Sequence, residues 1–77
     1  MYREAIRSFI SRSFPHEFSD DEDLFASGHV NEEFSMQIVT FVEREFGVHV
    51  RSDEYDVANF RSVNAINDFV ERKKAEG

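Results

Sequence analysis

The chain has 77 residues, no cysteine and a formal net charge of −7. This length fits one small domain spanning residues 1–77, and the lack of cysteine excludes a disulfide framework and a cysteine-based zinc site. Negative charge argues against nucleic acid, and no apolar run suits a membrane span or a signal peptide. We therefore expect a soluble, cytoplasmic protein, whose acidity serves either solubility alone or contact with basic patches on partners.

Residues 2–14 form the first expected helix, because apolar side chains recur at helical spacing along them. Pro15 should end this helix, since the residue before a proline is pushed out of the helical region. The expected inward face consists of Ile6, Phe9, Ile10 and Phe14.

Residues 15–30 form a long connection, which its apolar side chains should anchor to the rest of the fold. From Glu17 to Glu33 there are seven acidic residues and no lysine or arginine. The segment starting at Asp21 does not match a calcium-binding loop, because Phe25 occupies a ligand position and Ala26 occupies the position of the turn glycine. We expect a solvated acidic loop and no metal site. The expected anchors are Phe18, Leu24, Phe25 and Val30.

Residues 31–46 form the second expected helix, with Asn31 as its N-cap and Gly47 just beyond its end. Met36 and Val39 widen its apolar stripe towards a second face. Met36 is therefore either a core residue or an exposed and adaptable docking residue. The core stripe consists of Phe34, Ile38, Phe41, Val42 and Phe46.

The rest of the chain predicts an extended linker over 48–50, a short helix within 53–59 and a last long helix over 63–73. In the short helix, Tyr55 and Val57 or Phe60 should turn inward. Ser62 is the expected N-cap of the last helix. Three long helices and one short helix predict an all-α bundle. In the last helix, Val63, Ile66, Phe69 and Val70 should face inward, and Arg72, Lys73 and Lys74 should occupy the final turn.

The loop and the second helix resemble the modification-site region of acyl carrier proteins. The loop Asp23-Leu24-Phe25-Ala26-Ser27-Gly28 and the cap Asn31 match that family's pattern, as do the segments Phe34-Ser35-Met36-Gln37-Ile38-Val39 and Phe46-Gly47-Val48. The likeness covers almost the whole chain and is nearest to small stand-alone carriers of glyceryl- and methoxymalonyl-type units in polyketide pathways. The resemblance implies an acyl-carrier-like bundle.

The family's phosphopantetheine-bearing serine corresponds to Glu32, and the leucine after it corresponds to Glu33. A carboxylate has no hydroxyl to form the phosphodiester, so no arm is expected at Glu32. Glu32 could instead mimic the charge of the modified state, or both residues could simply favour the first turn of the helix. Ser35 is an alternative attachment site about 60° around the helix from Glu32 and one turn deeper, and Ser27 is a weaker one.

These observations predict a carrier-like module that acts either in a non-standard carrier role or by docking onto biosynthetic enzymes with basic patches. The expected docking residues are Asn31, Glu32, Glu33 and Met36. The alternative is an ordinary carrier whose serine has been replaced, although the change at Glu33 favours natural divergence. A free-standing regulatory interaction protein would differ only in its partners. We expect a monomer and no enzyme, because the histidines His16, His29 and His49 are scattered without catalytic or metal spacing, although His29 could bond Glu32 locally.

Overall fold

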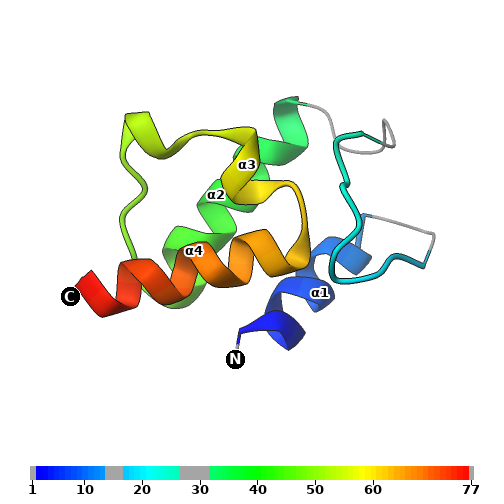
Figure 1. Cartoon of the computed structure of the whole chain (residues 1–77), viewed down its shortest axis with the longest axis horizontal. Helices are drawn as coiled ribbons and strands as arrows, with labels where there is room; N and C mark the ends of the chain where they lie inside the picture. Colours follow the sequence, from blue (N-terminus) through cyan, green and yellow to red (C-terminus); the bar gives the residue numbers. More distant parts are fainter. Residues whose placement is uncertain (1, 14–16, 27–31, 77) are drawn as a thin grey trace.

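Helices pack around a phenylalanine-rich core in the computed structural model, which describes residues 2–13, 17–26 and 32–76 (Figure 1). Helix α4 packs against both α1 and α3. The described residues contain no strand, so the predicted all-α bundle of three long helices and one short helix is confirmed. The elements are α1 (Arg3–Ser11), α2 (Glu32–Phe46), the 3₁₀ helix η1 (Ser52–Glu54), α3 (Val57–Phe60) and α4 (Val63–Glu76).

Helix α1 buries Ile6 and Ile10 and leaves Phe9 half-buried, as its apolar spacing predicts. It ends at Ser11, three residues before the predicted end. The chain then makes a tight turn, in which the Arg12 N–H donates to the Phe9 carbonyl at 3.3 Å and the Ser13 N–H donates to the Ile10 carbonyl at 3.1 Å. Phe14 and Pro15 lie outside the described residues.

Helix α2 begins and ends close to the predicted bounds. Gly47 follows it with a φ of +66°, the left-handed conformation that suits the residue after a helix. The Gly47 N–H donates to the Glu43 carbonyl at 3.0 Å. Phe41 is only half-buried, and Asn31 lies outside the described residues. The buried side chains of α2 are Phe34, Ile38, Val39, Val42 and Phe46.

The predicted helical turns within 53–59 form as two separate pieces, the 3₁₀ turn η1 and the short helix α3. Tyr55 is non-helical, and Asp56 is extended, with a carboxylate that accepts the Ala58 N–H at 2.9 Å and caps α3. This restart turns Phe60 into the core. Tyr55 and Val57, which were also candidates for the inward face, are exposed instead.

Helix α4 starts where predicted, with the Ser62 hydroxyl accepting the Ala65 N–H at 3.0 Å, and it continues three residues past the predicted end. Its predicted inward residues are all buried. Asn67 is also buried, which the apolar pattern did not predict. Its side-chain oxygen accepts the Tyr2 N–H at 2.8 Å and so ties the start of α1 to α4.

The connection before α2 is anchored as predicted at Phe18 and Leu24, which are buried. The Leu24 N–H donates to the Arg61 carbonyl at 2.7 Å. Arg7 reaches from α1 to the Phe18 carbonyl at 3.0 Å and to Asp20 at 2.8 Å. Among the described residues, no helix combines the length and apolar character needed to cross a membrane. The same residues contain no cluster of three or more acidic, histidine or cysteine side chains that could hold a metal ion.

Candidate docking site

The first turns of α2 carry the site that the sequence predicts. Glu33 and Met36 are exposed there, and Ser35 is half-buried. Asn31 lies outside the described residues, and of Glu32 only the backbone, as the first residue of α2, is described. A helix start favours negative charge, because its free amides give it a partial positive charge.

Three large apolar side chains are exposed on the described surface and line one cavity between α2 and α3. Met36 is 51% exposed, Tyr55 48% and Val57 53%. Phe25, Val39 and Phe60 also line this cavity. Clustered exposed apolar side chains are typical of interaction surfaces, whereas scattered ones need no explanation. We call Glu33, Met36, Tyr55, Asp56 and Val57 the α2–α3 patch.

The cavity within the α2–α3 patch has a volume of about 80 Å³. Small-molecule sites are commonly about 300–1,000 Å³, so this space is too small to enclose a ligand of ordinary size. It has room for the end of one apolar side chain. In shape, the site is therefore an open apolar surface with a shallow socket.

Met36 is an exposed residue, so its alternative role as a core residue is excluded. Its neighbour Val39 is 4% exposed and faces the core. The Met36 carbonyl accepts the Thr40 hydroxyl at 3.0 Å, which holds the backbone of this turn without engaging the Met36 side chain. The thioether is thus free to adapt to a partner surface.

Two acidic side chains border the apolar part of the α2–α3 patch. Glu33 is exposed and precedes Met36 by three residues, which places the two as neighbours on the helix surface. Asp56 lines the cavity itself. An apolar centre with an acidic edge complements a basic partner surface with an apolar anchor.

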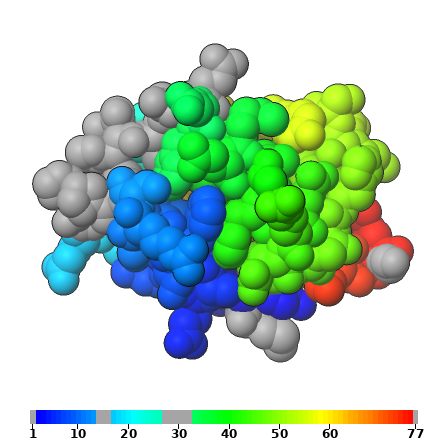
Figure 2. Space-filling view, turned by 180° about the vertical axis from the view of Figure 1, so that it is seen from behind, coloured from blue at the N-terminus to red at the C-terminus, as the bar shows by residue number. Residues whose placement is uncertain are grey.

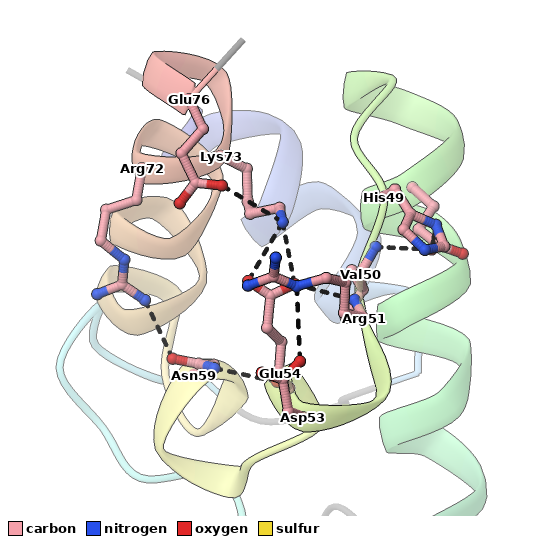
Figure 3. Close-up of polar contacts among 10 residues, drawn as sticks. His49, Val50, Arg51, Asp53, Glu54, Asn59, Arg72, Lys73 and Glu76 are labelled. Carbon is pink, nitrogen blue, oxygen red and sulfur yellow. Dashed lines mark hydrogen bonds and ion pairs between the residues drawn. The ribbon is translucent and has the colours of Figure 1, made fainter.

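A polar network fixes the segment that presents Tyr55 and Val57 (Figure 3). The Glu54 carboxylate accepts the Arg51 N–H at 2.9 Å and binds the Lys73 ammonium at 3.0 and 3.2 Å. The hydrogen bond from the Arg51 backbone and the contact with Lys73 lower the pKa of Glu54 below its usual value of 4.5. This network ties η1 to the last turns of α4.

A second contact fixes the start of α3 to α4 in the same region (Figure 3). The Asn59 amide donates to the Glu54 carbonyl at 3.0 Å, and its oxygen accepts from Arg72 at 3.1 Å. The loop that carries Tyr55 is therefore held from both sides. A held loop loses less conformational entropy when a partner binds.

Sequence reasoning identified Glu33 and Met36 but missed Tyr55 and Val57 as site residues. Asp56 was the available signal, because an aspartate before an apolar run is a common N-cap and predicts a helix restarting at Val57. Ser35 lines the cavity and is half-buried, one turn below the helix start.

His49 is exposed and lies 3.6 Å from the Glu43 carboxylate, at the far end of α2. His16 and His29 lie outside the described residues.

Comparison with protein-family models, curated proteins and solved structures gives no match for this chain. The likeness to acyl carrier proteins therefore rests on the sequence motif, and the docking interpretation rests on the α2–α3 patch.

Proposed function

We propose that this chain is an acyl-carrier-like module of a polyketide-type biosynthetic pathway that docks onto partner enzymes and carries no phosphopantetheine arm at position 32. The observation that carries the docking role is the gathering of Met36, Tyr55 and Val57, all about half exposed, around one cavity. The carrier-like assignment comes from the sequence motif around Glu32.

Docking is favoured because the α2–α3 patch combines a small socket with acidic edges. Burying the three apolar side chains supplies affinity, and the charges of Glu33 and Asp56 steer a basic partner into place. Charge steering acts mainly on the association rate and weakens as salt rises. A basic partner surface with one protruding apolar side chain fits both features.

The absence of an arm follows from the chemistry of position 32. Transfer of phosphopantetheine needs a hydroxyl oxygen that attacks the phosphorus, and a glutamate side chain has none. Ser35 remains the second candidate, because it lines the cavity of the α2–α3 patch. Its half-buried position one turn into α2 disfavours access by a transferase.

The intact mass of the protein after incubation with coenzyme A and a broad phosphopantetheinyl transferase tests this proposal. We expect no gain of one arm. A mass gain mapped to Ser35 would overturn the docking-only role and restore a working carrier. A Ser35→Ala variant distinguishes attachment at Ser35 from attachment elsewhere.

Two further variants test whether Glu32 alone blocks modification. We expect Glu32→Ser to be modified poorly and the double change Glu32→Ser with Glu33→Leu to be modified faster. The reason is that a charge at position 33 resists burial against the transferase. Equal modification rates would show that Glu33 plays no part, and full modification of Glu32→Ser would favour an ordinary carrier whose serine has been replaced.

A further inference from the structure

A second surface lies between α1 and α2 and adjoins the α2–α3 patch along α2. Gln37 and Thr40 on this surface lie one helical turn after Glu33 and Met36 of the patch. The surface is a groove of about 520 Å³. Figure 2 shows α1 and α2 side by side on this face of the molecule. The groove residues are Ala5, Ser8, Phe9, Arg12, Gln37, Thr40, Phe41, Arg44 and Glu45.

The floor of the groove is aromatic. Phe9 from α1 and Phe41 from α2 stack with their ring centroids 4.3 Å apart and an interplanar angle of 15°. Both rings are only half-buried, although both are packed against the core. The groove therefore exposes an apolar strip that runs between two helices.

The lining of the groove includes two arginines whose side chains make no hydrogen bond or ion pair in the described part of the chain. Of the nine lysines and arginines, five are paired with other side chains: Arg3, Arg7, Arg51, Arg72 and Lys73. In the described part of the chain, the side chains of Arg12, Arg44, Arg61 and Lys74 make no hydrogen bond or ion pair. Two of these four, Arg12 and Arg44, line this groove.

The charge of the groove contrasts with that of the whole chain. Arg12 and Arg44 outweigh Glu45, which leaves the lining at about +1, against a net charge of −7 for the protein. The other polar side chains of the lining, those of Ser8, Gln37 and Thr40, are exposed. An open, exposed lining of this kind does not enclose a small molecule, which normally buries most of its surface.

We propose that this groove docks an acidic amphipathic helix of a partner protein. The apolar face of that helix would lie on Phe9 and Phe41, as helices commonly lie in apolar grooves. Its carboxylates would pair with Arg12 and Arg44, whose planar guanidinium groups match carboxylate geometry. This partner differs in charge from the one that the α2–α3 patch suits, because the edge of that patch is acidic.

Two matched synthetic helices test the proposal. Each has about 18 residues, with leucine and phenylalanine on one face, and the flanking residues are glutamate in one peptide and lysine in the other. Titration into isotopically labelled protein, followed by amide chemical shifts, reports the binding surface. We expect the glutamate peptide to shift the amides of α1 and α2 around Phe9 and Phe41. No shift there, or stronger shifts there with the lysine peptide, would overturn the proposal.

Charge-removing variants identify the contacts. We expect Arg12→Gln with Arg44→Gln to weaken binding of the glutamate peptide roughly two- to thirty-fold, since exposed charge pairs are each worth about 0.2–1 kcal/mol. The matched control, Arg61→Gln with Lys74→Gln, removes the same charge elsewhere. If both double variants weakened binding of the glutamate peptide equally, the attraction would be non-specific, and the proposal would be overturned.

Sedimentation velocity of the protein alone separates a partner from a second copy of this chain. We expect a monomer at all concentrations that can be measured. A concentration-dependent dimer that the Arg12→Gln and Arg44→Gln changes abolish would assign the groove to self-association and overturn the partner assignment. We also expect Met36→Ala to leave the affinity for the glutamate peptide unchanged, because Met36 belongs to the α2–α3 patch and does not line the groove.

Discussion

Met36 lies on the flank of α2, outside the stripe that packs into the core. At 100° per residue, its side chain points about 160° away from Ile38, which is 1% exposed. Its exposure therefore follows from helix geometry once Ile38 and Val42 face inward. The same geometry places Met36 beside Glu33, so an apolar anchor and a charge occur together on one turn.

Met36→Ala should weaken docking without unfolding the protein. We expect faster dissociation of the lysine-flanked peptide and a change in unfolding free energy within about 0.5 kcal/mol, as for other exposed positions. Thermal melts and binding kinetics on the same variant measure both quantities. A loss of about 2–5 kcal/mol would instead be the mark of a core methionine. Gln37→Ala, one residue further on, is the matched control and should leave this binding unchanged.

Glu33→Lys should slow association of the same peptide, because it replaces an attracting charge with a repelling one at the edge of the α2–α3 patch. Raising the ionic strength should reduce the difference from the wild type, since salt screens exposed charges. Stopped-flow association at low and high salt measures this. An association rate that neither the variant nor salt changes would show that the acidic edge does not steer docking.

At the scale of elements, Glu54 joins η1 to α4 and thereby places Tyr55. Its folded-state pKa lies below 4.5, so its ionised form stabilises the fold above that pH, and this contribution is lost as the pH falls below 4.5. Glu54→Gln should therefore lower stability at pH 7 and differ less from the wild type as the pH falls towards 3. Denaturant unfolding across this range measures the effect. Asp53→Asn, on an exposed neighbouring carboxylate, should show a smaller difference.

Gly47 ends α2 with a backbone conformation that other residues adopt only with strain. Apart from Gly47 itself and its two chain neighbours, no heavy atom lies within 4 Å of the position of an added Cβ, so the strain is conformational and not a clash. Gly47→Ala should lower the unfolding free energy by about 1–2 kcal/mol. Gly47→Asn should lower it less, because asparagine tolerates the left-handed region better. Equal losses in a denaturant titration would contradict this explanation.

At the scale of the whole molecule, the connection before α2 is part of the core. Leu24 is fully buried, and its amide is bonded to the segment between α3 and α4. Leu24→Ala should lower the unfolding free energy by about 2–5 kcal/mol. Glu17→Gln, at an exposed position of the same connection, should change it by less than about 0.5 kcal/mol. A Leu24→Ala loss as small as this would mean that the connection is dispensable for folding.

The sequence by itself determined the features that depend on neighbouring residues. Apolar spacing located α2 and α4 and most of their buried faces, and Gly47 and Ser62 identified two helix ends, because caps and amphipathic faces are properties of a few consecutive residues. It also located Met36 and Glu33 on the first turns of α2 and left the exposure of Met36 open. The sequence also showed directly that position 32 is a glutamate, which has no hydroxyl to modify.

Only the tertiary structure decided which surfaces come together. Tyr55 and Val57 join Met36 because the Glu54–Lys73 contact, between residues far apart in the chain, fixes η1 against α4. Likewise, Arg12 and Arg44 line one groove only because α1 packs beside α2. Whether a charge is used within the fold or left for a partner depends on contacts between distant segments, and local periodicity carries no information about these.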